Sequence, residues 1–181
     1  MTVKSIIRIL TAFSVLAAAF SGCGTRESGT AVHSGTVYTA AATDTPPVMD
    51  GILNDPCWEK AESVSLVVSA DGKAPDLPTN VRMIRDDSML YIGFECRDTD
   101  AAGLATLRDG TIDEGDYIEI CIDADTDSVT YASIKIAPTG AVLDAFVLRA
   151  RDGATTKTMR DWNCEALRVS VSIYGGGARP G

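Results

Sequence analysis

The chain has 181 residues, of which 45% are apolar and 23% are charged, enough for one folded domain with a normal hydrophobic core. Its 25 Asp and Glu against 16 Lys and Arg give a net charge of −9, which repels phosphate backbones and argues against nucleic acid as a partner. With a single histidine, His33, the chain offers little material for a histidine-based catalytic triad or zinc site.

Residues 1–23 have the three zones of an exported bacterial leader. Lys4 and Arg8 give a positive start, residues 9–20 are mostly apolar, and two small residues precede Cys23. The apolar stretch is too short for a membrane-spanning helix and is typical of a signal peptide. Because small residues followed by cysteine also resemble a lipobox, we predict that Cys23 is lipidated and becomes the first residue of the mature protein.

Residues 24–46 are rich in Gly, Ser, Thr and Ala and lack apolar periodicity. Such a segment buries too little surface to offset the entropy of ordering it, so we predict a flexible tether. The leader and the tether together indicate an exported protein that is lipid-anchored to the cell envelope and touches the membrane through the lipid alone. Gly24 after the lipidated cysteine favours the outer membrane if the source is Gram-negative.

Residues 47–181 are predicted to form a single all-β domain. Short segments alternate apolar and polar residues and are separated by turn residues, as at 86–88 and 138–140. Alternation places the apolar side chains of each strand on one face, which is typical of an antiparallel β-sandwich of jelly-roll or immunoglobulin-like type. The expected strands are 81–85, 90–96, 117–123, 131–136, 141–148 and 167–173. One helical turn is expected at 55–60, where Pro56 follows the cap residue Asp55.

The opening of this domain, Val48 to Trp58, reads VMDGILNDPCW, and residues 116–127 read DYIEICIDADTD. Both phrases, together with segments 81–98, 131–140 and 162–171 in the same order and spacing, resemble the family 9 carbohydrate-binding modules and their DOMON-like relatives. The resemblance covers about residues 47–174. It implies the β-sandwich fold and non-catalytic recognition of an oligo- or polysaccharide in polysaccharide use.

The family implies two further expectations. Its modules bind sugar rather than cleave it, so we expect no enzyme activity in this chain. Because such modules often accompany xylanases and other glycoside hydrolases, a longer protein that contains this chain could be a glycoside hydrolase. Family members also continue with further strands after the segment that matches 167–173. The final strands of the sandwich are therefore expected to be missing, and the chain is expected to be part of a longer reading frame.

In sugar-binding members of this family the ligand lies between two tryptophans and is hydrogen-bonded by charged side chains. Glu119 matches the ligand-binding glutamate, Lys135 stands where an arginine is found, and Asp113 takes the place of one tryptophan. Trp162 follows a polar run and is a candidate either for an exposed sugar platform or for the core. Trp58 matches a residue that the family buries.

Asp123, Asp125 and Asp127 alternate in a loop between two expected strands. Carboxylates at this spacing can converge on Ca²⁺, which prefers oxygen ligands. A solvated acidic turn is the alternative, so no cofactor is certain and Ca²⁺ is a candidate.

Two other function classes stay open. One is a structural or interaction sandwich that has lost its sugar site, which the missing tryptophan at Asp113 favours. The other is a haem-binding DOMON-like domain, for which Met83 and Met89 are the available mid-domain ligands. The four cysteines after Cys23 allow three disulfide pairings, between which the sequence does not choose.

Overall fold

The computed structural model describes residues 5–14, 37–68, 71–99, 101, 106–150 and 154–174, and of residues 5–14 only the backbone. The strands are β1 (Ser5–Ser14), β2 (Ala41–Ala42), β3 (Val64–Ser65), β4 (Thr79–Arg85), β5 (Met89–Asp98), β6 (Ile118–Ile122), β7 (Thr130–Ile136), β8 (Val142–Arg149), β9 (Thr155–Met159) and β10 (Arg168–Tyr174). Two 3-10 turns, η1 (Pro56–Lys60) and η2 (Ile112–Glu114), complete the described elements. No helix within these ranges is long and apolar enough to cross a membrane.

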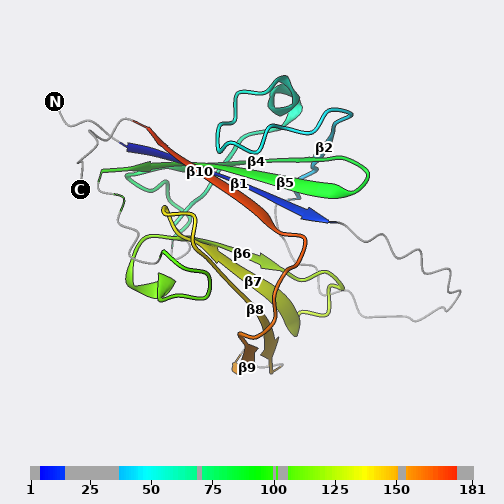
Figure 1. Ribbon diagram of the computed structural model, residues 1–181, viewed down its shortest axis with the longest axis vertical. Coiled ribbons are helices and arrows are strands. Elements are labelled where there is room, and N and C mark those ends of the chain that lie inside the picture. The colour runs from blue at the N-terminus through cyan, green and yellow to red at the C-terminus, as the bar shows by residue number, and fades with distance from the viewer. Residues whose placement is uncertain are drawn as a thin grey trace, which may run out of the picture.

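The strands form two sheets that lie face to face as two layers (Figure 1). The first has the order β10-β1-β5-β4-β2, with β3 also paired to β4, and the second has the order β6-β7-β8-β9. All neighbours run antiparallel except β2 and β4. The predicted all-β sandwich is therefore confirmed.

The core lies between the two sheets and follows the alternation seen in the sequence. Strands β4 and β5 supply one side and β6, β7 and β8 supply the other, because every second side chain of a strand points to the same face. The buried members of this cluster are Val81, Ile92, Phe94, Ile120, Ile134, Ile136 and Val142. All six strands expected from the sequence are thus found close to their predicted bounds.

The outer face of the first sheet is covered by the segment around η1. Trp58 is 1% exposed and packs with Leu53 over Ile84 and Tyr91, which point away from the inter-sheet core. This confirms Trp58 as a core residue and confirms the helical turn, which is of the 3-10 type. The side chain of Asp55 does not cap the turn and instead accepts a hydrogen bond from the Val48 amide at 3.2 Å.

Part of the segment expected to be tether lies on the domain. The Tyr38 hydroxyl donates to the Glu62 carbonyl at 2.6 Å and accepts from the Met83 amide at 3.0 Å. Strand β2 then pairs with β4, and the Thr43 amide donates to the Arg85 carbonyl at 2.8 Å. The domain therefore includes residues before Pro47. Cys23 and residues 24–36 of the expected tether lie outside the described residues, as does the Gly-rich stretch 175–181.

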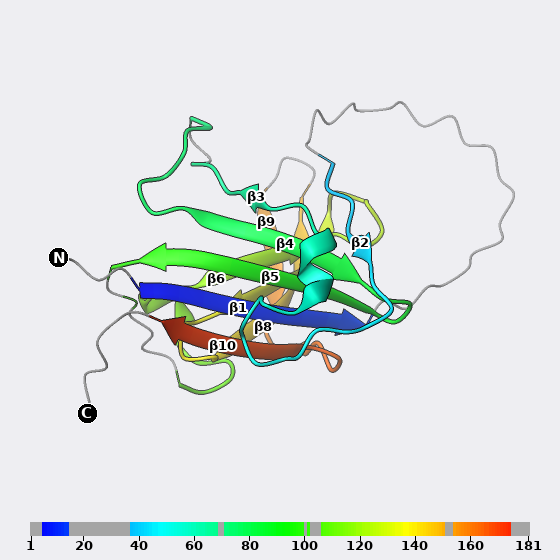
Figure 2. The ribbon, with the colours of Figure 1, turned by 90° about the horizontal axis from the view of Figure 1, so that it is seen from above.

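Strand β1 comes from within the expected leader. Its backbone runs between β5 and β10 and is antiparallel to both, with Ile9 opposite Phe94 on one side and Val171 on the other (Figure 2). The sequence pattern predicted no strand here, because an apolar run suits a signal peptide as well as a buried strand. In the described structure, β5 and β10 meet only through this strand.

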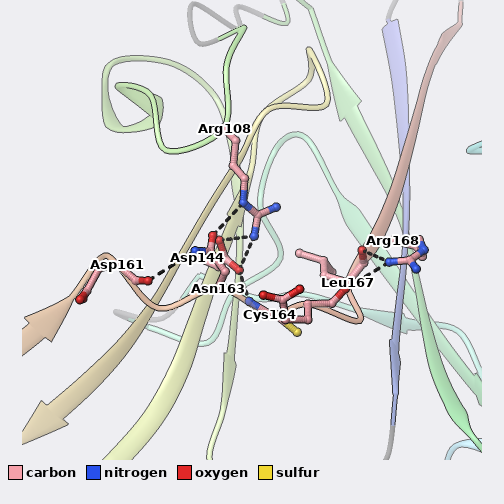
Figure 3. Close-up of polar contacts among 8 residues, drawn as sticks. Arg108, Asp144, Asp161, Asn163, Cys164, Leu167 and Arg168 are labelled. Atoms are coloured by element: carbon pink, nitrogen blue, oxygen red, sulfur yellow. Dashed lines mark hydrogen bonds and ion pairs between the residues drawn. The ribbon is translucent and has the colours of Figure 1, made fainter.

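An ion pair between half-exposed Arg108 and a buried carboxylate ties the loop before η2 to the second sheet (Figure 3). The Asp144 side chain, on β8, is 0% exposed. Both of its oxygens contact Nη2 of Arg108, at 2.7 and 2.6 Å, and Oδ2 also accepts from the Cys164 amide at 2.6 Å. Nε of Arg108 donates to Oδ1 of Asn163 at 3.0 Å. One carboxylate thereby joins three segments that are far apart in the sequence.

Gly51 is predicted to be indispensable because β10 lies against it. Its φ is +80°, and a Cβ atom there would be 2.7 Å from the Ser172 amide nitrogen, whereas Gly140 has φ +84° with nothing within 4 Å. A positive φ alone costs about 1 kcal/mol for alanine, and the backbone clash raises the cost of Gly51→Ala to about 2 kcal/mol or more. Urea unfolding of G51A and G140A measures both costs. Equal losses would show that the contact with β10 is absent.

The Arg108–Asp144 pair gives a second prediction. Arg108→Met leaves a buried carboxylate without its cation, so the free energy of unfolding should fall by about 2–3 kcal/mol. Arg168→Met, which removes an exposed guanidinium that donates only to backbone carbonyls, is the control and should cost less than about 1 kcal/mol. Adding Asp144→Asn to R108M should recover part of the loss, because the amide needs no counter-charge. An R108M loss no larger than that of R168M would contradict the role given to the pair.

Candidate functional site

The second sheet carries a groove on the face that points away from the core. The groove has a volume of about 190 Å³. Its floor is the apolar strip Leu143, Ala145 and Val147 of β8, which alternates with residues that face the core. Its remaining lining residues are polar or aromatic and come from β6, β7, β9 and the residue after β9: Glu119, Tyr131, Ser133, Lys135, Thr155, Thr158 and Arg160.

The structure brings the two expected sugar ligands together in this groove. Glu119 on β6 is the direct cross-strand partner of Lys135 on β7, so the two side chains stand next to each other on the same face. Glu119 is exposed, and its Oε1 accepts a hydrogen bond from the Ser133 hydroxyl at 2.6 Å. This bond fixes one oxygen of the Glu119 carboxylate.

Asp113 joins the two cations that line the groove. Its Oδ1 accepts a hydrogen bond from Nζ of Lys135, and its Oδ2 lies 3.9 Å from Nη2 of Arg160. Lys135 and Arg160 come from opposite sides of β8, so the carboxylate spans the apolar floor between them. The residue in the place of a family tryptophan thus forms, with Lys135 and Arg160, an ionic wall beside the groove.

These contacts shift the titration of both partners. The hydrogen bond from Lys135 is the main reason that the pKa of Asp113 lies below its ordinary value, with smaller help from the charge of Arg160. Partial burial of Lys135 works to lower its pKa, but the bond to Asp113 and the charges of Asp113 and Glu119 outweigh it and raise the pKa. Nζ also lies 4.8 Å from the centre of the Tyr117 ring, a favourable cation–π distance. The pair is therefore fully charged at neutral pH.

The loop that carries Asp113 is fixed from below. Ile112, the preceding residue, is 1% exposed and packs with Leu143 and two alanines of the β7–β8 turn. The Asp109 amide donates to the Val142 carbonyl at 2.8 Å, and Arg108 is held by Asp144. The position of Asp113 beside the groove thus follows from an apolar plug and an ion pair with a buried carboxylate.

The two tryptophans lie away from this groove. The Trp162 ring packs against Phe146, with centroids 6.1 Å apart and planes inclined by 50°. Phe146 alternates with the groove residues Ala145 and Val147 and so faces the other side of β8. The structure therefore does not bring Trp162 to Glu119 and Lys135, and Trp58 lies on the first sheet.

The expected calcium ligands do come together in the β6–β7 loop. Ligand oxygens of Asp123, Asp125 and Asp127 all lie within 4.8 Å of one another. Oxygens of the same carboxylates also hold the loop: Asp123 accepts from the Ser128 amide at 2.9 Å and Asp127 from the Thr130 amide at 2.7 Å. The bond from Thr130 is the main reason that the pKa of Asp127 is lowered. An acidic turn stabilised by its own amides accounts for this geometry, and Ca²⁺ binding stays a prediction.

Three further features of the described residues do not join this site: the two methionines, a second hollow and the cysteines. Met83 packs against the inter-sheet core and Met89 against the cluster around Trp58, so neither offers its sulfur to a cofactor-sized cavity. A hollow of about 350 Å³ lies between residues 43–48 and η1, but none of the expected site residues line it. The four cysteines within the described ranges are free thiols: Cys57, Cys96, Cys121 and Cys164. Burial is the main reason that the pKa of each thiol is raised.

Sequence reasoning missed one wall of the groove. Strand β9 supplies Thr155 and Thr158, and Arg160 follows it, yet this stretch was interpreted only as a polar run. Its β-branched residues were the available signal, because threonine is enriched in strands. The stretch lacks apolar alternation because β9 is an edge strand whose residues are exposed on both faces except for the half-buried Met159. The partners of Asp113 could not be read from local sequence.

Comparison with known proteins agrees with this architecture. The family described as carbohydrate family 9 binding domain-like matches residues 49–139, which is just over half of the chain and includes η1, β4 to β7, the groove residues Glu119 and Lys135, and Asp113. No curated protein and no solved structure gives a significant match. On the strength of this match and of its two-sheet fold, the chain belongs to the family 9 carbohydrate-binding domain-like proteins.

Proposed function

We propose that the groove on the second sheet is the carbohydrate-binding site and that it holds an oligosaccharide without cleaving it. The observation that carries the proposal is the pairing of Glu119 and Lys135 across β6 and β7, beside the apolar strip of β8. Charged side chains fixed by neighbours are suitable partners for sugar hydroxyls, while the apolar strip can take the C–H face of a sugar ring.

The size of the groove supports recognition of a short stretch of sugar. Its volume of about 190 Å³ lies below the ~300 Å³ at which pockets for drug-sized ligands begin, which leaves room for about one ring. Tyr131 supplies the aromatic edge of the groove, and the Arg149 guanidinium lies 5.0 Å from the centre of its ring and orients it. The remaining rings of an oligosaccharide would extend into solvent.

The wider role that we propose is attachment of a polysaccharide-degrading system to its substrate. A binding domain of this family holds polymer near the enzymes that cut it, and a glycoside hydrolase such as a xylanase in the same longer protein would fit this role. The present chain itself is proposed to contribute binding only.

Binding through the groove predicts that Glu119→Gln and Lys135→Met each weaken oligosaccharide affinity about tenfold, because each removes a charge-assisted hydrogen bond. Isothermal titration against a panel of soluble oligosaccharides measures the change. Glu59→Gln on η1, across the sandwich from the groove, is the matched control and should bind as the unmodified chain does. Unchanged affinity in both groove variants would place the sugar elsewhere.

A panel in which the unmodified chain binds no oligosaccharide would instead favour the structural or interaction role. The observation behind that alternative is the ionic wall, because Asp113 offers no aromatic ring for stacking.

We propose in addition that the protein is exported and anchored to the cell envelope through a lipid on Cys23. The positive start, short apolar stretch and small residues before this cysteine support the proposal. Cleavage there would remove the residues that form β1. The backbone groups of β5 and β10 that pair with β1 would then need another strand or a local rearrangement.

Lipid anchoring predicts a mature protein whose first residue is a lipid-modified Cys23, found in the membrane fraction of the producing cells. Mass spectrometry of the N-terminal peptide identifies that residue. Cys23→Ser should move the protein out of the membrane fraction or block its processing, whereas Cys121→Ser, which changes an exposed thiol of the domain, should not. A membrane-free protein that retains residues 5–14 would contradict the anchor and would agree with β1 as a permanent strand.

A further inference from the structure

The charge of the groove differs from that of the chain as a whole. Acidic residues outnumber basic ones by 25 to 16 in the sequence, yet the ionisable groups that line the groove are the cations Lys135 and Arg160 and the single acid Glu119. The two cations flank the floor of β8, and the group that compensates them, Asp113, comes from the separate 3-10 turn η2. A carboxylate therefore lies between two cations that line a sugar-sized groove.

This carboxylate is open to exchange with one from solvent. The Asp113 side chain is 46% exposed and that of Arg160 is 65% exposed, whereas that of Lys135 is only 19% exposed. Because Lys135 is mostly buried, it needs a negative partner close by. A neutral sugar that displaced Asp113 would remove the carboxylate to which Nζ of Lys135 is hydrogen-bonded and leave Glu119 as its acidic neighbour, whereas an incoming carboxylate would restore that hydrogen bond.

The rest of the groove has the groups that an acidic sugar needs beside its carboxylate. Leu143, Ala145 and Val147, which are 5–6% exposed, offer a narrow apolar strip to the face of the ring, and the hydroxyls of Thr155 and Thr158 can exchange hydrogen bonds with ring hydroxyls. Glu119 stands on the β6 side of Lys135 and would repel an anion there. The ligand carboxylate therefore has to lie on the opposite side, between Lys135 and Arg160.

We propose that the groove is selective for acidic oligosaccharides, and that the carboxylate of a uronic acid residue replaces Asp113 between Lys135 and Arg160. This inference rests on the proposed carbohydrate-binding function and names the ligand class for the same groove. Asp113 acts as an internal substitute for the ligand carboxylate in the free protein, so that the two cations are compensated in both states.

The test compares an oligogalacturonate with its methyl ester, because the two differ at the carboxylate and share the sugar rings. Titration calorimetry should show the acid binding about tenfold more tightly than the ester, which is the contribution expected of one charge-assisted contact.

Arg160→Met should remove most of that difference in affinity between the acid and the ester. Lys157→Met, which removes a cation from β9 outside the groove lining, should preserve it. Asp113→Asn should strengthen binding of the acid severalfold by removing the competing carboxylate, and should change binding of the ester little.

The possible outcomes separate the two proposals. Binding of the ester as tight as that of the acid would overturn the acidic preference and leave the carbohydrate-binding function intact. Binding of neither compound, nor of any neutral oligosaccharide, would overturn the function itself. A preference for the acid that survives both R160M and K135M would contradict the position given to the carboxylate. Thermal unfolding of each variant checks that the domain is still folded.

Discussion

The packing of β6, β7 and β8 against the first sheet determines both surfaces of the second sheet. Successive side chains of a strand point to opposite faces, so the isoleucines that fill the inter-sheet core fix which residues stand on the other face. Ile120 and Ile134 face inward, and Glu119 and Ser133 therefore face outward. A register shift of one residue would bury the charged side chains and move the apolar side chains of the core to the solvent-facing side of the sheet. The stability of the sandwich and the composition of the groove thus depend on the same register.

Much of this architecture follows from local sequence. Alternation in 90–96 and 131–136 places β5 and β7, because a period of two encodes which side chains share a face. Glu119 and Lys135 were matched to the family's ligand positions one by one, and their pairing is seen only in the structure. Trp58 was identified as buried on the basis of family resemblance. Strand β9 was not predicted because one of its faces lines the groove and the other is exposed to solvent, so its sequence shows no apolar alternation.

The other features that the sequence did not predict come from contacts between distant segments of the chain. Asp113 meets Lys135 and Arg160 only because the loop before it folds over Leu143 and is tied to Asp144, and no spacing in the sequence encodes that approach. The leader poses a different difficulty. A signal peptide and a buried strand both require a short apolar run, so residues 5–14 satisfy either role. Export and lasting occupancy between β5 and β10 are alternatives for the same residues, and processing at Cys23 decides between them.

Selectivity for an acidic sugar has to arise at short range in this protein. A net charge of −9 repels polyanions at a distance, but that repulsion is screened beyond about 8 Å at physiological ionic strength. Within the groove, a ligand carboxylate that replaces Asp113 keeps both cations paired, so little additional charge has to be desolvated. An aromatic wall would instead recognise the C–H face of the ring and would be indifferent to a carboxylate. Overall charge should therefore slow the approach of an acidic chain, while Lys135 and Arg160 determine how long it stays.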